Sequence, residues 1–550
     1  MIIEKIIGKI EDKITILLEG KISIIEGLLA FSLIISLRVF IEFFLASKAL
    51  SAELIIIEYL HNFLFFALAT ILLWFNLSFF LKINPKKIAR FFLWISWGIL
   101  FSPLLDMIKT GGEVYWSFYV IGGPKFLFSQ YISFFAGLPS GIVYFGTKIV
   151  FLSSIILSGL VVLIKTKNIV KSIFSALLAY TVLFIIGSAP SVAAILYYFF
   201  VKGKDFLIDM QSVHVIQVLA VPVPIFGVKL GNLAYALPYN LEFILYPLFL
   251  GLLFVLFLII DKKKVLFLLK NSRLPQLIYH SGLFFIGLGL GAWFYRENFS
   301  MNVFAIFAAL DLLICIWLAW LASVVVNDIY DFSLDLVSNP ERPLQCQEIS
   351  KKEYCEIGWL LFYFSLFGGL LVSFKFFGLL LVYQLIAWAY SASPYRLKRF
   401  PIVASFVSAM ASLVVFFMGF VLISGDQNIQ GLPWRVILLL IISYTLSLPI
   451  KDFKDIAGDE KDGIRTIPVI FGEEKGRIVV GSGIFISFVL SVFLLNERTL
   501  FFWALLFGGL SYFVVSNKKI HPRKIFWWLL PIIIAYGLIL VKTIFGRVIF

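Results

Sequence analysis

Long apolar runs separated by short polar connections follow one another from about residue 24 almost to the C-terminus. An α-helix needs roughly 20 residues to cross about 30 Å of hydrocarbon, and most of these runs are that long. We count about fifteen, of which about six precede residue 261 and about nine follow residue 276. A β-barrel alternation is absent, and a span in lipid must satisfy its own backbone polar groups. The pattern therefore predicts an all-α polytopic membrane protein.

Four regions follow from the distribution of these runs. Residues 1–22 place most of their apolar side chains on one helical face, which predicts an interfacial amphipathic helix. Residues 23–260 are expected to form a membrane domain of about six spans, for which no motif indicates a function. Residues 261–276 are expected to be a basic linker. Residues 277–550 then form a second membrane domain of about nine spans.

Composition and charge agree with this class of protein. With 61% hydrophobic residues, 14% charged residues and a mean hydropathy of +1.00, the chain lies outside the range of soluble globular proteins. The net charge is +14, but Lys and Arg occur in short clusters between apolar runs, which is typical of the positive-inside rule rather than of nucleic-acid binding. The clusters predict a cytoplasmic N-terminus. Neither a disulfide framework nor a zinc-ligand pair is indicated by Cys315, Cys346 and Cys355.

Two segments, Asn327 to Asp335 and Lys451 to Asp459, carry three aspartates each at the end of an apolar run. In both segments the aspartates are separated by 3 and then 4 residues. Helical geometry would place such residues within an arc of roughly 60° on one face. The aspartates are Asp328, Asp331 and Asp335 in the first segment and Asp452, Asp455 and Asp459 in the second.

Carboxylates at the end of a membrane span are costly unless they face a watery cavity and meet cations. Mg²⁺ suits such a site, because it takes a few carboxylates, keeps waters and shares its shell with substrate phosphates. A solvated juxtamembrane loop is the alternative for either segment alone. Because the pattern occurs twice, we expect a Mg²⁺ site between the segments, and the span count and the charge bias place it on the cytoplasmic side.

The motifs carry a family resemblance. NDIYDFSLDLVSNPERPL resembles the first Asp-rich signature of the UbiA superfamily of intramembrane prenyltransferases, and KDFKDIAGDEKDGIRTIPVIFG resembles the second. Between them, YSASPYRLK is similar to the tyrosine-and-basic segment of the chlorophyll-synthase-like branch. The resemblance covers about residues 275 to 550 and implies a C-terminal nine-helix UbiA-like bundle.

What the resemblance implies is a Mg²⁺-dependent transfer of a prenyl group from a polyprenyl diphosphate to an aromatic, hydroxyl or sugar-phosphate acceptor. It implies that the metal is held by Asp328, Asp331, Asp452 and Asp455, with Asp335 and Asp459 completing the shell. The resemblance also implies that the diphosphate is bound by Asn327, Arg342, Arg396 and Lys398. Tyr390 would face the reactive carbon. The alternatives are positive-inside anchoring for the basic residues and the interfacial aromatic belt for Tyr390.

Other readings of the sequence stay open. The stretch 400–405 lacks the Gly-Asn often found in the family, so the acceptor is not predicted. A CDP-alcohol phosphotransferase should have Asp-Gly followed by Ala-Arg, whereas Asp331 is followed by Phe332. A cation-coupled transporter or a lipid-handling protein is the alternative from another class, and it expects acids deep within discontinuous spans. His280 is expected to pack rather than to act as a base, and Asp311 lies unusually far inside a span.

Overall fold

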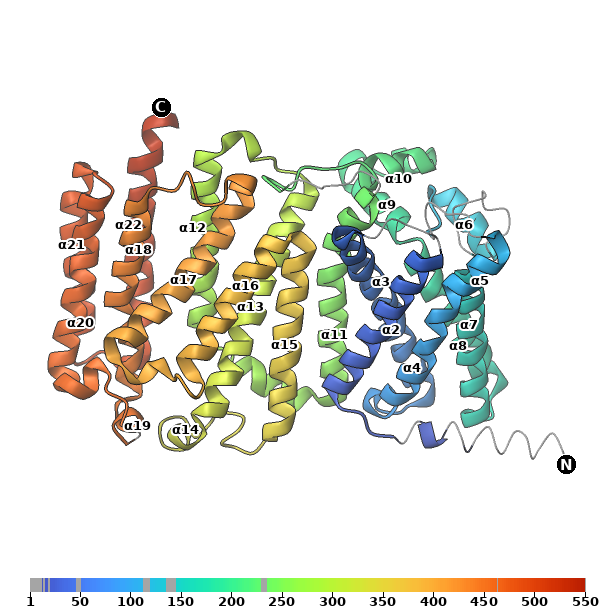
Figure 1. Cartoon of the computed structure of the whole chain (residues 1–550), viewed down its shortest axis with the longest axis horizontal. Helices are drawn as coiled ribbons and strands as arrows, with labels where there is room; N and C mark the ends of the chain where they lie inside the picture. Colours follow the sequence, from blue (N-terminus) through green and yellow to red (C-terminus); the bar gives the residue numbers. More distant parts are fainter. Residues whose placement is uncertain are drawn as a thin grey trace. The chain divides into compact units, whose positions relative to one another are not determined.

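The computed structural model describes residues 12, 15–17, 20–45, 51–111, 119–134, 145–228, 235–461 and 463–549 (Figure 1). Within these residues the regular elements are helices, and Ile225 and Val228 form one isolated bridge. In this described part of the chain, fifteen helices are long and apolar enough to cross a membrane, six before Leu274 and nine from there on. The predicted class and span count are thus confirmed, and the chain is a multi-pass integral membrane protein. The amphipathic helix predicted for residues 1–22 falls largely outside the described residues.

The chain forms two compact units. Unit 1 comprises residues 1–224, 229–265 and 302–311, and unit 2 comprises residues 225–228, 266–301 and 312–550. The helices up to residue 270 are α2 (Ile24–Leu45), α3 (Ala52–Leu81), η1 (Pro85–Lys87), α4 (Ala89–Ser96), η2 (Trp97–Leu100), α5 (Phe101–Thr110), α6 (Pro124–Ile132), α7 (Phe145–Thr166), α8 (Ile169–Gly187), α9 (Ala189–Lys202), η3 (Asp205–Ile208), α10 (Ser212–Leu219) and α11 (Ala236–Lys270).

Helix ends in this region follow local chemistry. The Ser51 side chain caps α3 by accepting a hydrogen bond from the Leu54 amide, at 3.2 Å. The apolar stretch 172–200 is divided between two helices, because α8 ends at Gly187 and α9 has Pro190 in its first turn. The residues expected to form a basic linker are largely helical, since α11 continues to Lys270 through a non-helical residue at Asp261.

Unit 1 buries ionisable side chains that lie far apart in the sequence. The Tyr119 hydroxyl lies 2.8 Å from His61 Nε2, and His61 Nδ1 lies 3.7 Å from Glu242 Oε1. Arg38 donates to Glu42 at 2.8 Å. The sequence did not reveal this cluster, because its members belong to α2, α3, α11 and a connecting segment.

The remaining helices are α12 (Leu274–Phe294), η5 (Arg296–Asn298), α13 (Val303–Tyr330), α14 (Phe332–Ser338), α15 (Lys351–Val372), α16 (Phe374–Ser391), η6 (Leu397–Arg399), α17 (Pro401–Ser424), η7 (Gly425–Gln427), α18 (Trp434–Ser447), η8 (Leu448–Lys454), α19 (Ile456–Lys461), α20 (Ile467–Leu494), η9 (Arg498–Leu500), α21 (Phe501–Ser516) and α22 (Pro522–Ile549). Within unit 2, α12 packs along α17, and α20 packs along α21.

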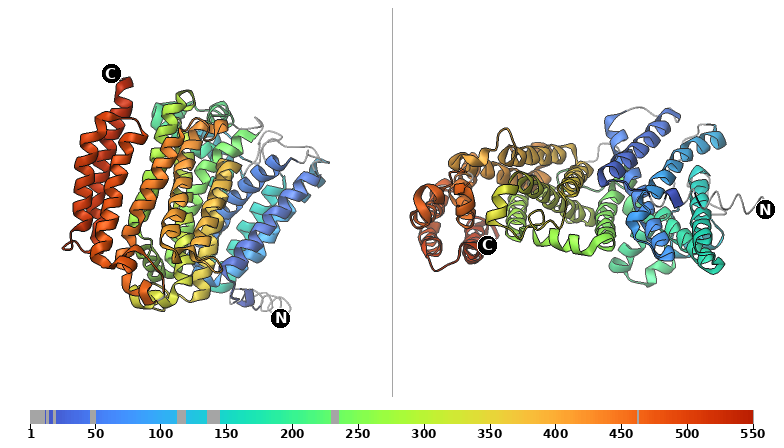
Figure 2. Two further views of the ribbon diagram at one scale, coloured as in Figure 1. Left: turned by 60° about the vertical axis from the view of Figure 1, so that its left-hand side comes forward. Right: turned by 90° about the horizontal axis from the view of Figure 1, so that it is seen from below.

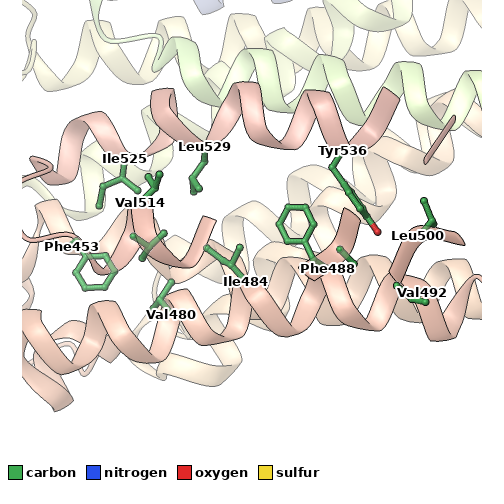
Figure 3. Packing of buried hydrophobic residues seen from close by; sticks show 12 residues of the cluster. Phe453, Val480, Ile484, Phe488, Val492, Leu500, Val514, Ile525, Leu529 and Tyr536 are labelled. Carbon is green, nitrogen blue, oxygen red and sulfur yellow. The ribbon is translucent and has the colours of Figure 1, made fainter. Parts of the chain in front are cut away.

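The last three helices of unit 2 run side by side, as both views of Figure 2 show. Phe488 of α20 and Tyr536 of α22 meet in the apolar core between them, with ring centroids 4.8 Å apart (Figure 3). At one end of this group, the buried Arg477 donates to the carbonyls of Asn517 and Ile520, each at 3.0 Å. This arginine fixes the turn between α21 and α22, because it satisfies carbonyls that have left their helix.

Candidate active site

The two Asp-rich segments share a break in the helix at their middle aspartate. The chain leaves helical geometry at Asp331 (φ −101°, ψ 16°), between α13 and α14. It does the same at Asp455 (φ −113°, ψ 9°), between η8 and α19. The similarity between the segments thus extends from spacing to backbone conformation, although neither is the single regular helix that the spacing suggested.

Helices α14 and α19 pack against each other at one end of unit 2 (Figure 1). Gly458 lies at this contact, where an added Cβ would be 1.9 Å from the Ser338 hydroxyl oxygen and 3.3 Å from a Leu334 methyl carbon. Glycine therefore permits the close approach that brings the second Asp-rich segment to the first.

Asp328 is 1% exposed and lies at the centre of a polar network. Its Oδ1 accepts from Arg273 Nη2 at 2.6 Å and from Arg342 Nη1 at 3.0 Å. Its Oδ2 accepts from Asn271 Nδ2 at 2.7 Å and from the Tyr354 hydroxyl at 2.9 Å. Two arginines on one buried carboxylate compensate part of the cost of burying its charge.

Asp331 contacts the two basic residues that the sequence assigned to the diphosphate. Its Oδ1 accepts from Arg396 Nη2 at 3.1 Å and from Lys398 Nζ. Burial lowers the pKa of Lys398, while the neighbouring Asp331 raises it. The tyrosine-and-basic segment and the first Asp-rich segment therefore meet at Asp331.

Arg342 links two aspartates of the first segment. Its Nη1 contacts Asp328 and also Asp335 Oδ2. Burial raises the pKa of Asp335 to about 6, although Arg342 and a hydrogen bond from Asn339 oppose that shift. The guanidinium therefore compensates a carboxylate that would otherwise be costly to ionise.

Asn339 joins the two segments directly. Its Nδ2 lies 3.0 Å from Asp335 Oδ1 and 3.3 Å from Asp455 Oδ1. Asp455 Oδ2 lies 3.7 Å from Lys454 Nζ. One amide thus bridges a carboxylate of each Asp-rich segment.

The other two aspartates of the second segment lie close to Asp455. Burial, followed by the charges of Asp452 and Asp455, raises the pKa of Asp459 to about 8. The Thr466 hydroxyl donates to Asp459 Oδ2 at 3.4 Å. Like charges of this kind repel, so a cation near the second segment would reduce the repulsion between its aspartates.

Tyr390 and Asn327 also have polar contacts that involve the Asp-rich segments. Lys451 Nζ lies 3.0 Å from the Tyr390 hydroxyl and 4.8 Å from the centroid of its ring. The Ser391 hydroxyl donates to Asn327 Oδ1 at 3.2 Å. Adjacent residues at the end of α16 thus reach both Asp-rich segments, Tyr390 through Lys451 and Ser391 through Asn327.

Several residues of this network were missed by the sequence analysis, namely Asn271, Arg273, Asn339, Tyr354, Lys451 and Lys454. Asn271 and Arg273 belong to the segment interpreted as a linker, where only their polarity and charge could have indicated a role in the site. Lys451 and Lys454 alternate with the aspartates of the second segment and could have been included on that ground. Nothing in the sequence indicated Tyr354.

The donor chemistry of the site suits a hard cation. Among the residues that the structure describes, no three His, Cys, Asp or Glu side chains are grouped closely enough to hold a metal ion. The aspartates of the first segment are instead paired with arginine, lysine or asparagine. Carboxylate and amide oxygens are nevertheless the donor types that Mg²⁺ prefers.

His280 and Asp311 are two further buried groups that the sequence singled out. His280 is buried, with Nδ1 2.6 Å from the Gln276 carbonyl and Nε2 3.1 Å from the Tyr383 hydroxyl. Asp311 is fully buried, and its carboxylate oxygens have no hydrogen-bond partner in the described structure.

Comparison with known proteins identifies the C-terminal half. Over 176 residues the chain is 34% identical to a chloroplastic 2-acyl-4-prenylphloroglucinol 6-prenyltransferase of Humulus lupulus, covering 29% of this chain and 41% of the relative. It is 26% identical to a digeranylgeranylglyceryl phosphate synthase of Methanosphaera stadtmanae over 162 residues, covering 30% and 57%. The chain thus spans about half the length of the curated relatives it matches.

Among solved structures, a UbiA homolog from Archaeoglobus fulgidus bound to GPP and Mg²⁺ aligns with a TM-score of 0.40 and 19% identity, covering 50% of this chain and 99% of that one. Residues 283–530 match the model of the UbiA prenyltransferase family. The C-terminal half of the chain, with its nine candidate spans and both Asp-rich segments, therefore belongs to the UbiA prenyltransferase family.

Proposed function

We propose that unit 2 is a Mg²⁺-dependent prenyltransferase that moves a prenyl group from a polyprenyl diphosphate to an acceptor within the membrane. The observation that carries this proposal is the meeting of both Asp-rich segments at Asn339, with Arg342 and Lys454 beside them. Such a mixture of carboxylates and cations suits a metal-bound diphosphate. Prenyl transfer is supported by the names of the relatives, which are a prenyltransferase and a digeranylgeranylglyceryl phosphate synthase.

In this proposal the protein binds the diphosphate through its basic side chains. Arginine can make paired contacts with phosphate oxygens, which lysine cannot. The residues assigned to the diphosphate are Arg342, Arg396, Lys398 and Asn327, and we add Arg273 because it contacts the same Asp328 as Arg342. The metal would be held by Asp328, Asp331, Asp452 and Asp455, with Asp335 and Asp459 in support. Bound Mg²⁺ would neutralise charge on the leaving diphosphate.

The transfer breaks the bond between C1 of the prenyl group and the diphosphate oxygen, and the electron pair leaves with the diphosphate. A nucleophilic atom of the acceptor then bonds to C1, and the acceptor loses a proton. Tyr390 is assigned to the wall near C1, where its ring would stabilise positive charge. Lys451 contacts the hydroxyl and orients the ring. The acceptor class is aromatic, hydroxyl or sugar phosphate.

We assign this end of unit 2 to the cytoplasmic side. The connection between α21 and α22 and the start of α22 carry a basic cluster, made up of Lys518, Lys519, Arg523 and Lys524. This cluster lies at the same end of unit 2, because Arg523 Nη2 is 3.7 Å from Oε1 of Glu341, the residue before Arg342. Clustered Lys and Arg in short connections favour the cytoplasmic side of a membrane.

Cation-coupled transport or lipid handling is the alternative for unit 1. It is favoured by the pairing of His61 with Glu242, which places ionisable groups inside candidate membrane spans. Such groups in spans are commonly functional. The aspartates of the first Asp-rich segment lie instead in and beyond the last turn of α13, and those of the second lie in η8, at its end and in α19.

The proposal is tested by incubating the purified full chain with Mg²⁺, labelled prenyl diphosphates of several lengths and extracted lipids. We expect release of diphosphate and a lipid product heavier by one prenyl group, identified by mass spectrometry. Removing divalent metal with EDTA should stop the release, and added Mg²⁺ should restore it. Release that persists in EDTA would exclude the metal assignment, and absence of release with every donor would exclude the function.

A further inference from the structure

Unit 1 contains an apolar cavity of about 380 Å³ between α3, the α4–α5 segment and α7. Its volume lies within the range of about 300–1,000 Å³ that is typical of small-molecule sites. Three phenyl rings in its wall, those of Phe66, Phe92 and Phe151, are themselves buried. The helices around it are candidate membrane spans, so hydrocarbon chains surround this part of the protein.

The wall is held open by its own packing. The ring of Phe92 stacks on Trp74 with centroids 5.7 Å apart, and the ring of Phe151 stacks on Phe65 at 6.3 Å. Aromatic pairs of this kind fix ring positions beyond what burial alone would achieve. The cavity is partly open, since its wall includes the exposed Phe101, so a chain from outside the protein can enter it.

The wall contains a few hydroxyl groups, those of Thr70, Ser96, Ser153, Ser154 and Ser158. The Ser96 hydroxyl donates to the Phe92 carbonyl and the Ser154 hydroxyl donates to the Val150 carbonyl, each at 2.8 Å. Both hydroxyls are therefore satisfied within their own helices. A wall that is mostly apolar holds water poorly and accepts hydrocarbon instead.

We propose that this cavity binds the isoprenoid chain of a membrane lipid. The apolar wall of the cavity, its volume and its position among candidate membrane spans favour a hydrocarbon chain as the ligand. The choice of an isoprenoid chain over a fatty acyl chain rests on the proposed function of unit 2. The site would belong to unit 1 and take no part in breaking the C1–O bond. It gives unit 1 a role in holding the isoprenoid lipid.

The test is photolabelling of the purified full chain with an uncharged geranylgeranyl alcohol that carries a diazirine, beside a straight-chain alcohol of equal carbon number. We expect the isoprenoid probe to label residues 91–105 and 149–158. Gly98→Phe should lower that labelling by about tenfold. An added Cβ at Gly98 meets no atom within 4 Å, so the new ring has room to enter.

Ser154→Phe is a second variant whose new ring should fill the cavity. The matched control is Leu160→Phe on the exposed side of α7, where the leucine side chain is 47% exposed. The control should label as the wild type does, and all three variants should keep wild-type diphosphate release. Equal labelling by the straight-chain probe, or unchanged labelling in both filled variants, would overturn the proposal. Cavity labelling in a chain that releases no diphosphate would refute the prenyltransferase function and leave the isoprenoid site standing.

Discussion

Asp328→Asn is expected to lower diphosphate release by at least about 10²-fold while the protein still folds. The substitution keeps the shape of the side chain but removes the charge that Arg273 and Arg342 share. It also removes one of the proposed metal ligands. The measurement is the initial rate of diphosphate release at saturating Mg²⁺ and prenyl diphosphate.

Asp426→Asn is the matched control for this substitution. Asp426 lies in η7, its side chain is 83% exposed, and it pairs with Lys375 on the surface. Exposed ion pairs contribute little, so the control should retain wild-type release. Full turnover by Asp328→Asn would show that the first Asp-rich segment does not act in the reaction.

Arg342→Met is expected to destabilise unit 2 by about 3–5 kcal/mol, the usual cost of removing one partner from a buried ion pair. Methionine nearly preserves the length of the side chain without its charge. Asp335 would lose its guanidinium partner and keep the weaker hydrogen bond from Asn339. Asp328 would retain Arg273, so the main cost falls on Asp335. Thermal unfolding in detergent, followed by tryptophan fluorescence, measures the effect.

The double variant Arg342→Met with Asp335→Asn should recover most of the lost stability, because it no longer buries an uncompensated carboxylate. Arg399→Met, at an exposed position in η6, should leave the unfolding temperature unchanged. If Arg342→Met unfolded at the wild-type temperature, the buried ion pair would not exist in the membrane protein.

The span count could be predicted because the length of an apolar run is a local property of the sequence. Helix ends were less predictable, as the division between α8 and α9 at Pro190 shows. The spacing of the aspartates correctly indicated two related segments, but it could not reveal the helix breaks at Asp331 and Asp455. Those breaks depend on how α14 and α19 pack, which is tertiary information.

The partners of the aspartates were predictable only where a motif contained them. Arg396 and Lys398 were assigned from the basic segment, and both contact Asp331. Arg273 and Tyr354 lie 55 residues before and 26 residues after Asp328, and no periodic pattern connects residues so distant. The cavity of unit 1 was also beyond prediction, since apolar side chains in a membrane helix look alike whether they face lipid, a neighbour or a void.

The central claim is that both Asp-rich segments together bind a metal-bound prenyl diphosphate. It is tested most directly by electron paramagnetic resonance of Mn²⁺, used in place of Mg²⁺, with a prenyl thiolodiphosphate that does not ionise readily. We predict bound Mn²⁺ coupled to phosphorus in the wild type, and loss of that coupling in Asp328→Asn and in Asp452→Asn separately. Phosphorus-coupled Mn²⁺ that persisted in both variants would contradict the account.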